Sequence, residues 1–372
     1  MNNNLIIRAD ASVQIGTGHV MRCLTLADEL RGRGAEVVFV CREFDGNLCG
    51  YTEDKGYIVH RLPVSDTPKQ NTESRLKHAA WLGADWQTDA GQVEEIIKSL
   101  GTTPDWFVVD HYALDERWEG YLRPYYKKIM VIDDLADRPH DCDLLLDQNF
   151  YENLESRYDG LVPSGCKKLL GPKYALLRPE FMEARKNLRK RDGYVKRIMI
   201  FFGGSDPTNE TTKALEAIRM LNRPDIAVDV VVGSANSHKD KINELCVAMT
   251  NVVYHCQVEN MAQLISDADL FIGGGGSTTW EKCCLGLPSL IMSTARNQDA
   301  IAVGCDQAGI GVHINKSKNI SPNQVQIEIK KMFLNQTALL TMGKKSANMV
   351  DGKGANHVAS FLTGCEKQGA TL

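Results

Sequence analysis

A histidine follows a glycine-containing turn near the start of the sequence. Gly16 and Gly18 precede His19 in IIRADASVQIGTGHVMRCLTLADEL, residues 6–30. Glycines let the backbone approach a ligand closely, and a helix that begins here offers unpaired N–H groups and a partial positive charge. Imidazole titrates near neutral pH, so His19 is a candidate general base; the alternative is a capping residue hydrogen-bonded to its own loop. Met21 replaces the third glycine of a G-x-G-x-x-G fingerprint, so we expect no nicotinamide cofactor.

Two more glycine turns, FFGGSDP and GGGGSTT, follow apolar runs and precede predicted helices. Backbone N–H groups and hydroxyls at a helix start can bind the phosphates of a ligand. The alternatives are a helix N-cap in the first turn and a flexible turn in the second. The candidate ligand-binding residues of the two turns are Gly204, Ser205, Asp206, Gly276, Ser277 and Thr278.

Polar side chains that can bind a sugar or a ribose lie close to the second of these turns. Glu281 comes one helical turn after it, where a carboxylate can accept from a ribose diol or simply favour the helix dipole. Asn297 and Gln298 follow the apolar run 290–292, and their amides can contact sugar hydroxyl or acetamido groups.

Apolar runs that alternate with helical patterns must position these residues. In the first half the runs are residues 5–8, 37–40, 106–109, 129–132 and 144–146, and in the second half 198–202, 228–232, 270–272 and 290–292. Runs without polar alternation indicate parallel strands covered on both faces. Ligands bind beyond the carboxyl ends of such strands, and the glycine turns lie there. The sequence therefore predicts an α/β protein with two Rossmann-like, doubly wound domains facing a cleft.

Length and composition limit the organisation and the class of partner. A chain of 372 residues suits two domains, which we expect at residues 1–185 and 194–350, with residues 351–372 as a tail of unassigned role. The net charge of −4 and the lack of a basic tract argue against a nucleic-acid partner. The chain lacks a long apolar stretch and a signal-like N-terminus, so we expect a cytoplasmic protein, a monomer, with no membrane partner.

Cysteine and aspartate patterns do not predict a metal site or a disulfide framework. The 11 cysteines are an odd number scattered through apolar segments, as in reduced cytosolic proteins. The D-x-D pairs 141–143 and 267–269 precede apolar runs, at the wrong end of a sheet for a ligand. We therefore expect neither a metal nor a cofactor.

Several segments together resemble the PseG family, the UDP-2,4-diacetamido-2,4,6-trideoxy-β-L-altropyranose hydrolases of bacterial pseudaminic acid synthesis. They are RADASVQIGTGHVMRCLTLA, VVDHYALDERWE, IDDLADRPHDCDLLLDQN, LLGPKYALLRPEF, FFGGSDPTN and GGGGSTTWEKCCLGLP with ARNQ, in the family's order. The resemblance covers roughly residues 5–310. It implies a glycosyltransferase-B type fold, UDP held mainly by the second domain, and metal-independent hydrolysis of the sugar–oxygen bond with inversion.

The resemblance also implies roles for individual residues. His19 matches the family's general base, Tyr112 its active-site tyrosine, Arg178 and Glu281 its substrate-binding pair, and Asn297 its sugar-side asparagine. Asn149, at the end of IDDLADRPHDCDLLLDQN, is a further substrate-binding candidate. The expected partner is a small-molecule UDP-sugar.

Two other functions remain open from the residues alone. The loop GTGHVMRCLTLADELRGRG also resembles the glycine-rich loop of MurG, an N-acetylglucosaminyltransferase, so a transferase of the same fold is the first alternative. A non-catalytic nucleotide-sugar binding protein is the second. In the hydrolase, water attacks the face opposite the leaving group and His19 takes its proton, while the helix start near Ser277 stabilises the departing UDP.

Overall fold

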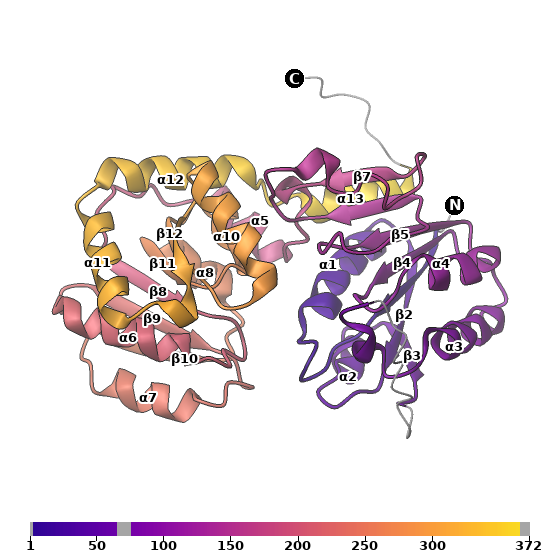
Figure 1. Ribbon diagram of the computed structural model, residues 1–372, viewed down its shortest axis with the longest axis horizontal. Helices are drawn as coiled ribbons and strands as arrows, with labels where there is room; N and C mark the ends of the chain where they lie inside the picture. The colour runs from indigo at the N-terminus through magenta and orange to yellow at the C-terminus, as the bar shows by residue number, and fades with distance from the viewer. Residues whose placement is uncertain (1–2, 65–75, 365–372) are drawn as a thin grey trace. The chain divides into compact units, whose positions relative to one another are not determined.

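A computed structural model of the protein describes residues 3–64 and 76–364 (Figure 1). The side chains of residues 296, 297, 316 and 317 are not described. The chain forms two compact units. Unit 1 contains the described residues of 3–149, 153–176 and 353–364, and unit 2 contains residues 150–152 and 177–352.

Unit 1 is a parallel sheet with the strand order β3-β2-β1-β4-β5-β6-β7. The strands are β1 (Asn4–Ala9), β2 (Glu36–Arg42), β3 (Ile58–Leu62), β4 (Trp106–Asp110), β5 (Lys128–Ile132), β6 (Leu144–Asp147) and β7 (Lys167–Leu170). The helices are α1 (Gly18–Gly32), α2 (Cys49–Asp54), α3 (Trp86–Ser99), α4 (Glu116–Leu122) and α13 (Gly354–Thr363). Chain order reverses between β1 and β4, so the carboxyl ends of these two strands meet where a doubly wound sheet binds its ligand.

Unit 2 repeats the architecture with the strand order β10-β9-β8-β11-β12-β13, again parallel. Its strands are β8 (Arg197–Phe201), β9 (Ala227–Val232), β10 (Val252–Cys256), β11 (Leu270–Gly273), β12 (Ser289–Ser293) and β13 (Val312–Lys316). Its helices are α5 (Pro179–Lys186), α6 (Glu210–Leu221), α7 (Lys239–Val247), α8 (Met261–Asp267), α9 (Thr278–Cys284), α10 (Arg296–Ala308), α11 (Pro322–Phe333) and α12 (Gln336–Met349). The prediction of two doubly wound α/β domains is confirmed.

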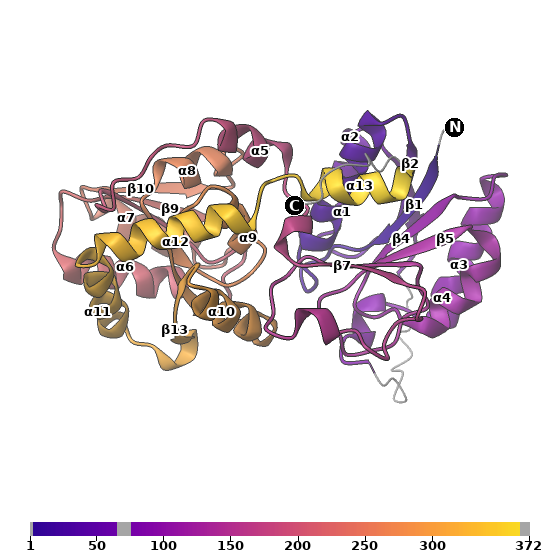
Figure 2. The same ribbon diagram turned by 90° about the horizontal axis from the view of Figure 1, so that it is seen from above.

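Helix α13 differs from the tail expected at residues 351–372. It packs beside α1 in unit 1, as the two views of Figures 1 and 2 show. Val358, Ala359 and Leu362 are buried in the same apolar core as Leu26 and Leu30 of α1. Residues 177–185, expected in the first domain, lie in unit 2.

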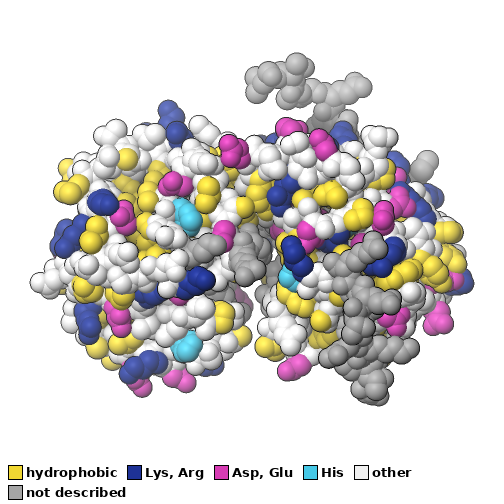
Figure 3. Space-filling model, in the orientation of Figure 1, with side chains coloured by type: hydrophobic (Ala, Val, Ile, Leu, Met, Phe, Trp, Pro, Cys, Tyr) yellow, Lys and Arg dark blue, Asp and Glu magenta, His cyan; other side chains and the backbone are white. Residues whose placement is uncertain are grey.

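None of the helices in the described chain is long and apolar enough to cross a bilayer. On the face drawn in Figure 3, the described acidic and basic side chains are interspersed with apolar ones. This face therefore shows no large patch made only of acidic or only of basic side chains among the described residues.

Candidate active site

His19 is the second residue of α1, directly after the turn that leaves β1. Gly16 adopts a φ of +80°, which favours glycine, and its N–H donates to the carbonyl of Ser12 at 2.8 Å. The helix N-cap is Thr17, and no side chain caps it. The His19 ring instead reaches β4, so the alternative of a histidine bonded to its own loop is wrong.

A buried carboxylate orients the His19 ring. Nδ1 lies 2.6 Å from Oδ1 of Asp110, the last residue of β4. Burial alone would raise the pKa of Asp110, but Arg22 and His19 hold it well below its usual range. An ionised carboxylate only accepts hydrogen bonds, so Nδ1 carries the proton. No hydrogen bond to Nε2 occurs within the described chain, which leaves this nitrogen available to accept a proton.

Arg22, one helical turn after His19, fixes Asp110 from the other side. Its Nε donates to Oδ2 and its Nη2 donates to Oδ1, both at 2.6 Å. This two-point contact matches the planar geometry of guanidinium and carboxylate. The thiol of Cys23 adds a weaker contact to Oδ2 at 3.5 Å. Asp110 thus has little freedom to turn away from the imidazole.

A second carboxylate, Asp134, joins the expected residues Tyr112 and Asn149. The Tyr112 hydroxyl donates to Oδ1 of Asp134 at 2.5 Å, and Nδ2 of Asn149 donates to Oδ2 at 3.0 Å. The Tyr112 ring meets the His19 ring edge to face, with centroids 4.6 Å apart. His19, Tyr112 and Asn149 are therefore brought together as expected, at the carboxyl edge of the unit 1 sheet.

Asp110, Arg22 and Asp134 are site residues that were not predicted from the sequence. Two signals could have found them. Asp110 ends an apolar strand two residues before the candidate Tyr112, and Arg22 stands three residues after His19, on the same face of the helix. Asp134 carried no comparable signal, since its role depends on the position of the β5–β6 loop.

The turn after β8 requires a correction for Asp206. Its buried carboxylate accepts from the backbone N–H groups of Glu210 and Thr211, each at 2.9 Å, and from the Thr211 hydroxyl at 2.7 Å. Asp206 therefore holds the first turn of α6 although the N-cap residue is Asn209, and its carboxylate is not available to a ligand. Gly204 and Ser205 of the same turn are exposed.

The glycine turn after β11 is held by Gln298, which changes the role expected for this side chain. Its Oε1 accepts from the N–H of Gly275 at 3.2 Å and from the N–H and hydroxyl of Thr294 at 3.2 and 3.0 Å. The amide oxygen that we expected to face a sugar thus fixes the turn instead. Gly276, Ser277 and Thr278 lead into α9 with no side-chain cap. The Asn297 side chain lies outside the described residues.

Arg178 and Glu281, expected as a pair, lie near each other in unit 2. Nη2 of Arg178 is 3.7 Å from Oε1 of Glu281 and 3.0 Å from Oε1 of Glu180. Burial raises the pKa of Glu281 to about 7, against the opposing effect of Arg178. The Glu281 side chain is still 18% exposed, so a ligand can reach it.

The D-x-D residues lie at strand starts, as expected. Asp269 pairs with Arg189 at 2.5 Å and accepts from the N–H groups of Lys196 and Arg197. Asp143 pairs with Arg123 at 2.6 Å. Within the described residues, no group of three or more histidines, cysteines or acids is placed to hold a metal ion.

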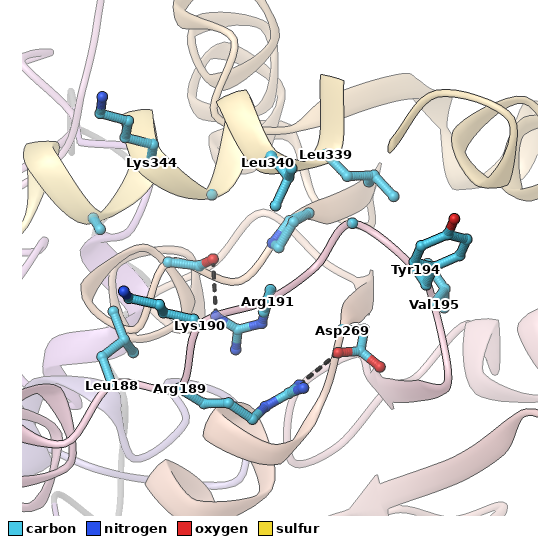
Figure 4. Close-up of a pocket in the computed structure, with 15 residues that line it drawn as sticks. Leu188, Arg189, Lys190, Arg191, Tyr194, Val195, Asp269, Leu339, Leu340 and Lys344 are labelled. Atoms are coloured by element: carbon cyan, nitrogen blue, oxygen red, sulfur yellow. Dashed lines mark hydrogen bonds and ion pairs between the residues drawn. The ribbon is translucent and has the colours of Figure 1, made fainter. Parts of the chain in front are cut away.

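A pocket of about 280 Å³ in unit 2 is separate from the expected residues (Figure 4). The segment 188–195 and helix α12 line it, with Leu188, Leu339 and Leu340 among its apolar side chains. Asp269, the residue before β11, also lines the pocket, so the pocket lies at the amino end of β11. Because the glycine turns are at the carboxyl ends, this pocket is not part of the candidate site.

The chain is similar in sequence to a known domain family and to a bacterial UDP-sugar hydrolase. Residues 198–358 match the family described as the glycosyltransferase family 28 C-terminal domain. The UDP-2,4-diacetamido-2,4,6-trideoxy-beta-L-altropyranose hydrolase of Campylobacter jejuni is 27% identical over 83% of this chain and 98% of its own. The chain resembles the PseG family. That resemblance, first noted from the motifs, is thereby confirmed.

Two further sequences and a solved structure are also similar. The spore coat polysaccharide biosynthesis protein SpsG of Bacillus subtilis is 25% identical over 96% of each chain. A protein of Methanocaldococcus jannaschii that is named as uncharacterized is 27% identical over 77% of this chain. The match covers only 55% of that protein's own length. The crystal structure of Acinetobacter baumannii MurG superposes with a TM-score of 0.68 at 14% identity, covering 98% of this chain and 100% of that one. The glycosyltransferase-B type fold is confirmed.

Proposed function

We propose that this protein hydrolyses a UDP-sugar to UDP and the free sugar. The observation that carries the proposal is the His19–Asp110 pair, which leaves Nε2 of an oriented imidazole without a partner in the described chain. At the coarser level, an enzyme that uses a UDP-sugar agrees with the C. jejuni relative and with the family 28 domain. The sugar we propose is the 2,4-diacetamido-2,4,6-trideoxy-β-L-altropyranose that names this relative.

In the proposed reaction, a water molecule attacks the anomeric carbon on the face opposite UDP. Its proton moves to Nε2 of His19, its oxygen bonds to carbon, and the carbon–oxygen bond to UDP breaks with both electrons leaving on UDP. The Asp110 carboxylate stabilises the imidazolium that forms, which later releases the proton to solvent. Configuration at the anomeric carbon is inverted because a single displacement occurs.

Unit 2 supplies the nucleotide-binding groups in this proposal. The N–H groups of the turn at Gly276–Thr278 and of the exposed turn at Gly204 and Ser205 would neutralise the diphosphate, so we expect no metal to be needed. The Glu281 carboxylate, beside Arg178, would accept from the ribose hydroxyls, and Asn297 would contact the sugar. UDP is a good leaving group and needs no acid from the protein.

A glycosyltransferase is the second candidate, favoured by the match to the family 28 C-terminal domain. There His19 would take its proton from an acceptor hydroxyl instead of water. Both reactions use the same base, so the identity of the nucleophile distinguishes them.

Incubation with the UDP-sugar alone in H₂¹⁸O tests the proposal. We expect turnover without an acceptor, with ¹⁸O in the sugar and none in UDP, and unchanged turnover in excess EDTA. No turnover unless an acceptor is added would favour the transferase. Binding without any turnover would indicate a nucleotide-sugar binding protein, and ¹⁸O in UDP would indicate attack at phosphorus.

A further inference from the structure

Five side chains form a closed ring of contacts around the Nδ1 side of His19. Asp110 holds His19, Arg22 holds Asp110, and Nη1 of Arg22 lies 3.6 Å from Oδ2 of Asp134. Asp134 accepts from the Tyr112 hydroxyl, and the Tyr112 ring contacts the His19 ring at 4.6 Å. Arg22 is thus the link between two carboxylates, each of which orients one aromatic ring.

The ring carries two carboxylates and one fixed cation. Arg22 contacts both Asp110 and Asp134, so within the ring one fixed positive charge offsets one of the two negative charges while the imidazole is neutral. When His19 accepts a proton, the charge becomes zero. The Arg22 side chain is 12% exposed and Asp110 is fully buried, so water screens these charges weakly.

The other titratable groups around His19 do not change this balance near neutral pH. Burial lowers the pKa of His111 and of His78, which keeps both rings neutral. Burial raises the pKa of the Cys23 thiol and of the Tyr112 hydroxyl, which keeps both protonated. Arg138, which lies over the Tyr112 ring, is paired with Asp133 and Asp137.

Farther out, two groups face Asp134 from the β6 side. Burial and Asp134 raise the pKa of Asp147 to about 7, and Arg157 pairs with Asp147 at 3.2 Å. These two groups offset each other in charge when Asp147 is ionised.

We propose that Arg22 is a positioning residue that sets the pH range in which His19 acts as a base. It fixes both carboxylates in place and offsets one unit of the negative charge beside the imidazole. Without Arg22 the charge beside the imidazole is more negative by one unit, so the imidazole retains its proton to a higher pH and cannot accept one from water there. The inference rests on the proposed function for its catalytic consequence, whereas the charge effect on His19 is measurable without substrate.

Two substitutions that change the charge beside His19 in opposite directions test the proposal: Arg22→Gln removes a positive charge and Asp134→Asn removes a negative one. In Arg22→Gln we expect the acidic limb of the kcat/KM–pH profile, and the His19 imidazole titration followed by NMR, to move about one unit to higher pH. In Asp134→Asn, which keeps an oxygen for the Tyr112 hydroxyl, both should move to lower pH. Arg22→Lys should keep the limb near that of the wild type while losing rate, because an ammonium lacks the two-point contact.

The matched control is Arg31→Gln, which removes a cation from the same helix where its side chain is 46% exposed and paired with Asp28. We expect no movement of the limb. The proposal would be overturned if the Arg22 and Asp134 variants all lost rate while the acidic limb of the kcat/KM–pH profile and the NMR titration of His19 stayed in place. A large rise in KM alone for Arg22→Gln would overturn it too. Shifted NMR titrations in a protein that does not hydrolyse the UDP-sugar would refute the proposed function and retain the role of Arg22. If Arg22→Gln fails to fold, Asp134→Asn and Arg22→Lys carry the same test.

Discussion

At the residue scale, the proposed chemistry depends on a histidine and the acid that orients it. His19→Asn cannot accept the proton, so we expect kcat to fall about 10² to 10⁴-fold with a much smaller change in KM. Asp110→Asn should also lower kcat, since a neutral amide no longer stabilises the imidazolium. Steady-state kinetics and circular dichroism provide the measurement.

Unit 2 offers a control for this pair. His255 on edge strand β10 contacts Asp229 on β9 through Nε2 at 2.9 Å, so this is also a histidine–aspartate pair. His255→Asn should leave kcat within a few fold of the wild type. Comparable losses in the His19 and His255 variants would contradict a specific role for His19.

Glu281 gives a second prediction at this scale, based on its pKa of about 7. A carboxylate accepts from ribose hydroxyls most strongly when ionised, so UDP affinity should rise as pH increases from 6 to 8. Glu281→Gln should weaken UDP binding at pH 8, remove this contribution and leave kcat nearly unchanged. Calorimetric titration with UDP at several pH values measures the difference in affinity between the wild type and Glu281→Gln. Protonation of UDP itself affects both proteins equally, so it cancels in this comparison.

Glu180→Gln refines the same measurement. Glu180 raises the pKa of Glu281 by like-charge repulsion, so its removal should move the binding transition to lower pH. A collapse of kcat at constant KM in Glu281→Gln would mean that Glu281 takes part in the chemistry.

At the element scale, the turn after β11 depends on a close approach between strands. A methyl group at Gly273 would overlap the carbonyl oxygen of Phe201 in β8 and the Phe271 ring. Gly273→Ala should therefore cost about 1–3 kcal/mol of unfolding free energy, as overpacking typically does. Denaturant unfolding measures it.

Gly274→Ala is the matched control, because its methyl group would meet its nearest neighbour, Oε1 of Gln298, at 3.4 Å. We expect little loss of stability there. Equal destabilisation by the two substitutions would show that the turn, not the strand contact, limits stability.

At the scale of the whole molecule, the end of the described chain returns to unit 1. Besides its apolar contacts, α13 accepts two hydrogen bonds from Arg33, the residue that follows α1. The acceptors are the Ser360 hydroxyl at 3.0 Å and the carbonyl of Asn356 at 2.9 Å. A chain that ends at Gly352, or Val358→Asp, should lower the unfolding temperature of unit 1 and spare that of unit 2. Scanning calorimetry, with UDP added to mark the unit 2 transition, measures this.

Leu334→Asp provides the control for the α13 variants, since Leu334 is 88% exposed in unit 2. Neither transition should move. A loss confined to unit 2 in the variants that lack α13 would contradict the division of the chain.

The central strands were predictable, whereas the edge strands were not. The predicted runs correspond to β1, β2, β4, β5, β6, β8, β9, β11 and β12, all of them inside the two sheets. The strands left out are β3, β7, β10 and β13, the four edges. Edge strands such as β10 are half-exposed and mix polar with apolar residues, so they lack the continuous apolar pattern of a strand covered on both faces.

The sequence by itself determined the local features: apolar central strands, glycine turns at their carboxyl ends, and a histidine at the start of a helix. These depend on residues close together in the chain. Only the tertiary structure decided that Asp110, 91 residues from His19, orients the imidazole, that Arg22 links it to Asp134, and that Asp206 and Gln298 support turns. The physical reason is that such partners meet through strand order and loop position, which arise from packing across the whole sheet and leave no periodic signal in the sequence.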